Sequence, residues 1–141
     1  MKRSNGLLIA VILLAYVSCK KQPGPVNEKN YAPHYIALNK YQPVNMDGEI
    51  LTCSLDSVIQ DSRCPVNATC VWQGVAVARF KISRKNIQNT ITLATFKFGE
   101  YDTNTTVAGF KIELINVSPY PELAIPHNYN DYVAEVKITK L

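Results

Sequence analysis

The sequence predicts an all-β domain, either a small antiparallel β-sandwich or a partly open barrel, of about six to seven strands. From residue 34 onward, apolar and polar residues alternate with the two-residue period of strands that have one face in a core. Clusters of Gly, Pro, Asn, Asp and Ser separate these runs. The sequence after residue 34 shows no helical periodicity and no internal repeat. Short strands spaced in this way are typical of sandwiches and barrels.

The first eighteen residues predict a signal peptide. Lys2 and Arg3 precede an unbroken apolar run over 7–17, and Ser18 follows it. A basic start, an apolar stretch and a small residue near the cleavage point form the three parts of a secretory signal. The run is too short to cross a bilayer, which takes about 20 residues.

The end of this signal resembles the lipobox of bacterial lipoproteins. The letters VSC at 17–19 carry the resemblance, while Tyr16 departs from the Leu that is usual at its place. The resemblance implies that Cys19 is acylated and becomes the first residue of a mature chain anchored in the membrane. Lys20 and Lys21 resemble the residues that follow this cysteine in lipoproteins sent to the outer membrane, so the chain is expected to be anchored there. The periplasmic and surface faces of that membrane both stay open. Ordinary secretion after cleavage is the alternative.

Residues 19–33 predict a flexible tether, because they are polar and Pro-rich and show no periodicity. Residues 34–141 are then expected to form a single all-β domain. Removing residues 1–18 takes away Lys2 and Arg3 and no acidic residue, so the formal charge falls from +4 to +2. A chain so near neutrality is not expected to bind nucleic acid.

Six strands are expected in order. They span 34–44, 49–60, 75–82, 89–98, 106–117 and 131–140. Asp47-Gly48 is a hairpin turn candidate before the second of them. The alternation assigns shared faces to Ala76, Ala78, Phe80 and Ile82, opposite Val75 and Val77; to Ile91 and Leu93, opposite Ala94, Phe96 and Phe98; to Phe110, Ile112 and Leu114; and to Tyr132, Ala134, Val136 and Ile138.

Three cysteines follow Cys19, which allows at most one disulfide within the chain. Cys64 and Cys70 enclose five residues, including a proline, and are expected to pair. A loop this short contributes about 2 kcal/mol by the loop-entropy model. Cys53 shares a strand face with apolar neighbours and is expected to be a buried core thiol. The alternatives are that it pairs with Cys64 or Cys70, or that it is reactive.

The stretch DSRCPVNATCVWQG at 61–74 is interpreted as a structural motif. Asp61 is suited to starting a turn, and Arg63 to pairing with it or lying on an aromatic face. Trp72 is expected to cap one end of the core, and Gly74 to allow a bulge or a close backbone approach. A catalytic site here would need a base or a thiolate, and no histidine lies nearby in the sequence.

No other pattern predicts chemistry, so neither an enzyme nor a metal or cofactor is expected. The two histidines, His34 and His127, are isolated, and the cysteines lack zinc-site spacing. No pair stands out among the scattered carboxylates Glu49, Asp56, Glu100, Asp102 and Asp131. There is no phosphate-binding Gly-rich loop and no GxSxG elbow.

The segment 118–130 is a candidate binding loop, with Tyr120, His127 and Tyr129 as its candidate contact residues. Tyr-rich loops stiffened by proline suit partner binding at the end of a sandwich. The alternative is that these aromatic rings fold back on the core.

These motifs together resemble a family of small, mostly uncharacterised bacterial lipoproteins and secreted proteins. The pattern is DSRCP, four residues, CxWxG and a later SPYP, and the resemblance covers about residues 48–140. It is carried by Asp61, Ser62, Arg63, Cys64, Pro65, Cys70, Trp72, Gly74, Pro119, Tyr120 and Pro121. The family implies a β domain in an exported setting and brings no activity, cofactor or catalytic residue.

Three functions are compatible with these observations. The first is a lipid-anchored envelope domain that binds a protein, peptide or glycan without chemistry. The second is an inhibitor of an exported hydrolase, such as a protease or lysozyme, with the loops at 61–70 and 118–130 as wedges. The third is a redox or metal-handling protein that uses Cys53, Cys64 and Cys70.

Overall fold

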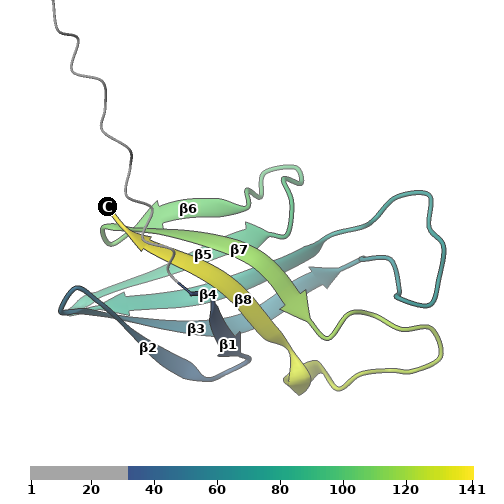
Figure 1. The fold of residues 1–141 in the computed structure, drawn as a ribbon, viewed down its shortest axis with the longest axis horizontal. Helices are drawn as coiled ribbons and strands as arrows, with labels where there is room; N and C mark the ends of the chain where they lie inside the picture. The colour runs from purple at the N-terminus through teal and green to yellow at the C-terminus, as the bar shows by residue number, and fades with distance from the viewer. Residues whose placement is uncertain (1–31) are drawn as a thin grey trace, which may run out of the picture.

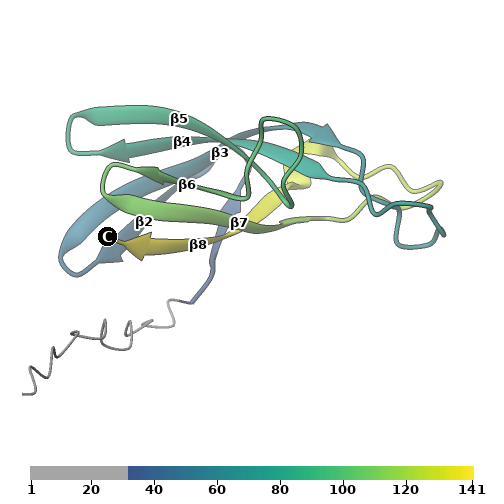
Figure 2. The same ribbon diagram turned by 90° about the horizontal axis from the view of Figure 1, so that it is seen from above.

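The computed structural model describes residues 32–141, which form two four-stranded sheets packed face to face (Figures 1 and 2). One sheet has the order β1-β8-β7-β6 and the other β2-β3-β4-β5, and every neighbouring pair is antiparallel. The elements in chain order are β1 (His34–Ala37), β2 (Tyr41–Met46), β3 (Glu49–Asp61), β4 (Ala76–Arg84), β5 (Ile87–Ala94), β6 (Asn104–Val107), β7 (Phe110–Ser118), the 3-10 turn η1 (Tyr129–Asp131) and β8 (Val133–Lys140). The predicted β-sandwich is confirmed.

The predicted signal peptide at 1–18 and the predicted lipidation site Cys19 lie outside the described residues. The predicted tether does as well, except for Ala32 and Pro33, which are exposed. Within residues 32–141, no helix is long and apolar enough to cross a membrane.

The core lies between the sheets and is built from the strand faces that the alternation assigned. Phe80 and Phe110 are the largest of the fully buried side chains. The other members include Ile36, Leu51, Cys53, Leu55, Ala76, Ala78, Ile82, Leu93, Ile112, Leu114, Val117, Tyr132, Ala134, Val136 and Ile138. Because successive side chains of a strand point to opposite faces, the polar residues between them reach the solvent.

Residues 32–141 contain eight strands, because two of the expected strands each divide in two. Within the expected strand at 34–44, Asn39 adopts a positive φ of 57° and the chain passes from the β8 edge to the β3 edge. Within the expected strand at 106–117, Ala108 and Gly109 have φ of 52° and 83° and form a two-residue hairpin turn. The strands before and after these tight turns both carry apolar residues, so the hydrophobic pattern of the sequence does not show where one strand ends and the next begins.

A second, smaller apolar cluster covers the outer face of β4 and β5. Val75, Val77 and Ala94 are fully buried there. Phe96, Phe98 and Tyr101, from the segment after β5, pack against them. This segment explains why β4 and β5 carry apolar residues on both faces.

The two ends of the sandwich differ in their connections. At one end, two-residue turns join β2 to β3, β4 to β5 and β6 to β7. There Arg84 donates hydrogen bonds to the Ala108 carbonyl (2.6 Å) and to Glu49 (2.5 Å), which ties the three hairpins together. At the other end two long loops project beyond the sheets (Figure 1). Binding residues are often found on long loops that a rigid sandwich positions, so the long-loop end is the place to look for a site.

Candidate functional site

The candidate site is the pair of long loops at 62–75 and 119–132, which we call the two-loop tip. The first loop joins β3 to β4, and the second joins β7 to β8. Both extend from the same end of the sandwich in two perpendicular views (Figures 1 and 2). They come from different sheets, so any contact between them also connects the two layers.

A buried ion pair at the base of the two-loop tip joins the loops. The Arg63 side chain is 2% exposed and that of Asp61 9%. Arg63 donates to both carboxylate oxygens of Asp61, from Nε (2.8 Å) and Nη2 (2.7 Å). The same guanidinium donates to the carbonyl of Val117 on β7 and to that of Pro119 in the second loop. A buried charge pair of this kind is stable only when its remaining hydrogen bonds are satisfied, and here they are.

Two aromatic residues complete the surroundings of this pair. The Tyr132 hydroxyl donates to Asp61 Oδ2 (2.9 Å). Arg63 Cζ lies 4.1 Å from the centroid of the Tyr120 ring, in cation–π geometry. Arg63 thus does both things expected of it, since it pairs with Asp61 and lies on an aromatic face.

The environment shifts two pKa values in opposite directions. Burial by itself would raise the pKa of Asp61, but the hydrogen bonds and charge of Arg63 outweigh it and hold this pKa below its usual 3.8. Burial, together with the hydrogen bond to Asp61, raises the pKa of Tyr132 to about 12. At neutral pH the carboxylate is therefore ionised and the phenol is protonated, as the hydrogen bonds require.

The Asp61 carboxylate makes the stability of the domain depend on pH. Because its folded pKa is depressed, its contribution is complete above the usual pKa of 3.8 and is lost as the pH falls through the folded value. We expect the free energy of unfolding, measured in urea, to fall with acidification below about pH 4, and Asp61→Asn to flatten this part of the profile. The exposed Glu122→Gln is the control. A profile in Asp61→Asn as steep as in the wild type would contradict this account.

Gly74 allows the ends of the first loop to approach closely. It is buried with a φ of +66°, and a Cβ placed on it would lie 1.8 Å from the carbonyl oxygen of Ser62. Ser62 bonds across this contact, donating its backbone N–H to Val75 O (2.9 Å) and accepting the Val75 N–H at Oγ (3.3 Å). The close approach predicted for Gly74 is confirmed.

Gly74→Ala is expected to destabilise the domain by more than about 2 kcal/mol, since it adds a steric clash to left-handed backbone strain. Gly99→Ala is the matched control. Gly99 also has a positive φ, +56°, but nothing lies within 4 Å of its Cβ position. Urea unfolding of the two variants separates the clash from the strain. Equal losses of stability would show that the contact with Ser62 is unimportant.

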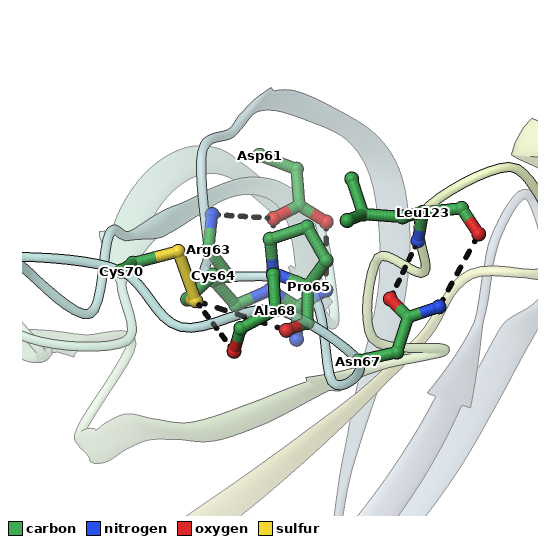
Figure 3. The surroundings of a disulfide bond; sticks show 8 residues. All are labelled: Asp61, Arg63, Cys64, Pro65, Asn67, Ala68, Cys70 and Leu123. Atoms are coloured by element: carbon green, nitrogen blue, oxygen red, sulfur yellow. Dashed lines mark hydrogen bonds and ion pairs between the residues drawn. A yellow bond between two sulfur atoms is a disulfide. The ribbon is translucent and has the colours of Figure 1, made fainter.

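The disulfide predicted between Cys64 and Cys70 is present, with a Cα–Cα distance of 5.9 Å (Figure 3). Cys53 is free and buried in the core, as expected. Burial raises the pKa of its thiol to about 12. The thiol therefore stays protonated at neutral pH and lacks the thiolate character of reactive cysteines.

Direct hydrogen bonds join the outer parts of the two loops. Val66 N–H donates to the Pro121 carbonyl (3.0 Å). The Asn67 side chain pairs with the backbone of Leu123 in both directions: its Oδ1 accepts the Leu123 N–H (2.8 Å), and its Nδ2 donates to the Leu123 carbonyl (3.3 Å; Figure 3). Together with the disulfide, these bonds hold the two-loop tip in one conformation.

Trp72 does not cap the core, contrary to expectation. It is 56% exposed, and the preceding Val71 is fully exposed. The disulfide at Cys70, the bond from Cys64 N–H to the Gln73 carbonyl (2.9 Å) and the turn at Gly74 direct the intervening residues outward. The polar assembly around Asp61 and Arg63 closes this end of the core instead.

The three candidate contact residues of the second loop each make contacts within the domain. Tyr129 Oη accepts the Val58 N–H (3.0 Å) and donates to the Val58 carbonyl (3.2 Å). His127 and Tyr129 both contact Tyr132 edge-to-face, with ring centroids 4.9 Å and 5.5 Å away. Tyr120 lies over Arg63. Their rings thus brace the second loop, while Tyr120 and Tyr129 remain 45% and 48% exposed.

Five apolar side chains of the two-loop tip are more than half exposed. They are Val66, Val71, Trp72, Leu123 and Ile125. Residues 64–75 carry no charge, and residues 119–130 carry only Glu122 as a charged residue. A surface rich in apolar and aromatic groups and depleted of charge has the composition found at the centre of protein interfaces. The small number of charges in both loops was the sequence signal for this surface.

A hollow of about 330 Å³ lies on the outer face of the β2-β3-β4-β5 sheet, away from the two-loop tip. Its lining includes Tyr41, Thr52, Lys81, Ser83 and Thr90. Lys81 is ion-paired with Asp56, whose hydrogen bond and charge raise the pKa of Lys81. The hollow therefore presents hydroxyls and a paired charge rather than a free acid or base.

A metal site requires a group of ligating side chains close together. Within residues 32–141, no three His, Cys, Asp or Glu side chains lie together as metal ligands would. The isolated His34 has its pKa lowered by burial.

Comparison of the chain with protein-family models, with curated protein sequences and with solved structures found no match. Membership of the lipoprotein family that the DSRCP, CxWxG and SPYP segments resemble is therefore a proposal.

Proposed function

We propose that this chain is a lipid-anchored module of the bacterial cell envelope that binds a partner through the two-loop tip and performs no chemistry. The observation that carries the proposal is the combination of rigidity and exposed apolar surface in one projecting feature. The disulfide, the bonds of Asn67 and the Arg63 ion pair restrain both loops. A restrained surface loses little conformational entropy on binding, so more of its contact energy appears as affinity.

The partner class that this surface favours is a protein. Val71 and Trp72 offer large apolar contacts without flanking charges. Hot spots of protein interfaces are enriched in Trp and gather in desolvated centres. A peptide or glycan partner is the less favoured form of the same proposal, because the Asn67 amide, which could bond such a ligand, is engaged with Leu123.

A photo-crosslinking residue at position 71 tests where the partner binds. We expect it to crosslink one defined partner in the native envelope, because Val71 is the most exposed apolar side chain of the two-loop tip. The same residue at Ile50, which is 59% exposed on the β2–β5 sheet, is the control. Crosslinking from position 50 but not from position 71 would place binding elsewhere. Turnover of a substrate by the purified chain would contradict a role without chemistry.

Inhibition of an exported hydrolase is the second candidate function. It is favoured by the projection of both loops beyond the sheets, which suits insertion into a cleft (Figure 1). A panel of exported proteases and muramidases would be assayed with the wild-type chain and with a variant in which residues 66–72 are replaced. Inhibition that depends on this segment would support the second function over simple binding.

The proposed anchor rests on the lipobox-like ending at Cys19 and on the tether after it. Intact-mass analysis of the chain from its native membrane is expected to show a mature protein that begins at an acylated Cys19. Cys19→Ala should release the domain from the membrane fraction. An unacylated chain in the wild type would make the protein a secreted, soluble factor.

A further inference from the structure

One edge of the sandwich lacks the features that normally prevent strands of different molecules from pairing. The four sheet edges are β1, β6, β2 and β5. Strands β1 and β6 have only four residues each, and β2 contains Pro43. Strand β5, with the sequence IQNTITLA, has eight residues without a charge or a proline and pairs with β4 without a bulge. Short length, proline, charge and bulges are the usual protection of an edge, and β5 has none of them.

The outward-pointing backbone groups of β5 can be identified from its register. The two-residue turn pairs Arg84 with Ile87 in a hydrogen-bonded pair, so the next residue and every second one after it point away from β4. These are Gln88, Thr90, Thr92 and Ala94. Ala94 confirms the direction, since its N–H donates to the Asp102 carbonyl (3.0 Å) and not to β4. Figure 2 shows β5 along the upper edge of the molecule.

The same edge leaves part of the core incompletely covered. Strands β5 and β6 belong to different sheets and are not neighbours in either ladder. Ile91 on β5 and Val107 on β6 are accordingly only partly buried, although both pack against the core. Ile87, at the start of β5, is 55% exposed. A strand added to β5 would satisfy backbone groups and cover apolar surface at once.

We propose that β5 pairs antiparallel with β5 of a second copy of this chain, with the twofold axis at Thr90. In this register Thr90 lies opposite the partner's Thr90, and Gln88 lies opposite the partner's Thr92. The N–H and C=O groups of Gln88, Thr90 and Thr92 are then all bonded. Pairing stops before Ala94, whose N–H is already bonded to Asp102.

The chemistry of β5 favours its own copy over another strand. A twofold interface brings each residue near its own equivalent, so any charge at the centre would face a like charge. Strand β5 carries none. Its exposed face presents Gln88, Thr90 and Thr92, and threonines directly opposite each other stabilise antiparallel pairs. On the inner face, Ile87 would lie opposite the partner's Leu93, which covers an exposed apolar side chain.

Sedimentation equilibrium of the full-length chain in mild detergent tests the proposal. The variants place a positive or a negative charge at Thr90, on the twofold axis. The wild type is expected to dimerise. Thr90→Lys and Thr90→Glu should each weaken self-association at least about tenfold, because two like charges meet at the axis. Each variant should then be monomeric at concentrations at which the wild type is a dimer. An equimolar mixture of the two variants should form the heterodimer, which only self-pairing at Thr90 predicts. Thr106→Lys, on the β6 edge of the other sheet, is the matched control and should dimerise like the wild type.

A second variant keeps the test independent of the charge effect. Residues in a hydrogen-bonded antiparallel pair have Cα atoms about 5.5 Å apart, which is within the range of a disulfide. Thr90→Cys should therefore give a covalent dimer on mild oxidation, and Thr106→Cys should not. Circular dichroism confirms that each variant is folded.

Three outcomes would overturn the proposal. The wild type could remain monomeric up to about 1 mM, which corresponds to an association free energy weaker than about 4 kcal/mol. Thr90→Lys could dimerise as tightly as the wild type, which would place the interface elsewhere. Protection of the β5 amides from hydrogen exchange only in the presence of a different protein would show that a foreign strand occupies this edge.

Discussion

Replacing Arg63 with alanine is expected to lower the free energy of unfolding by about 3–5 kcal/mol. In a domain of this size, such a loss lowers the melting temperature by about 12 °C or more. The substitution leaves the Asp61 carboxylate buried without its counter-ion. It also leaves the carbonyls of Val117 and Pro119 without their donor. Thermal and urea unfolding measure the effect directly.

Two further variants separate the charge from the packing. Arg79→Ala removes an exposed arginine from β4 and is expected to change stability by less than about 0.5 kcal/mol. Adding Asp61→Ala to Arg63→Ala removes the unpaired charge and should recover part of the lost stability. If Arg63→Ala costs less than about 1 kcal/mol, the ion pair does not hold the two sheets together at this end.

Removing the Trp72 side chain is expected to weaken partner binding by about 30-fold or more, without a measurable change in stability. The indole is more than half exposed, and among residues 32–141 Trp72 belongs to neither buried apolar cluster. A loss of at least about 2 kcal/mol on truncation is the typical effect of a hot-spot tryptophan, and 1.4 kcal/mol is a factor of ten in affinity. The measurement is calorimetric titration of Trp72→Ala with the purified partner that crosslinking from position 71 identifies.

Ile50→Ala is the matched control for this experiment, because Ile50 is exposed to a similar extent far from the two-loop tip. It should bind the partner as the wild type does. Equal affinities of Trp72→Ala and the wild type would exclude the two-loop tip as the centre of the interface. A loss of affinity accompanied by a lower melting temperature would instead reveal a structural role for Trp72.

The two-loop tip and β5 make separable contributions to these proposals. Trp72 lies in the loop between β3 and β4, whereas Thr90 lies in the middle of β5. Thr90→Lys is therefore expected to leave the affinity of each two-loop tip for its partner unchanged. It removes only the extra avidity that a dimer with two such tips would have. Failure of one proposal would leave the other standing.

The sequence by itself determined which residues face the core within each strand. Phe80 and Ile82 on β4, and Val136 and Ile138 on β8, are buried as their alternation predicted. Period two is a local property, since successive side chains point to opposite faces whichever sheet the strand joins. The disulfide was predictable for the same reason, because a six-residue separation brings two cysteines together without help from the rest of the chain.

Only the tertiary structure decided what the loop residues do. Trp72 is exposed because the polar assembly around Arg63 closes this end of the core. The two carbonyls that Arg63 bonds there, those of Val117 and Pro119, are 54 and 56 positions from it in the chain. Tyr129 is a brace because Val58, 71 positions away, offers it an N–H and a carbonyl. The free edge of β5 likewise follows from strand order, which alternation does not encode. The direction of a strand side chain is set by its own backbone, whereas the role of a loop side chain is set by distant segments that happen to pass within reach.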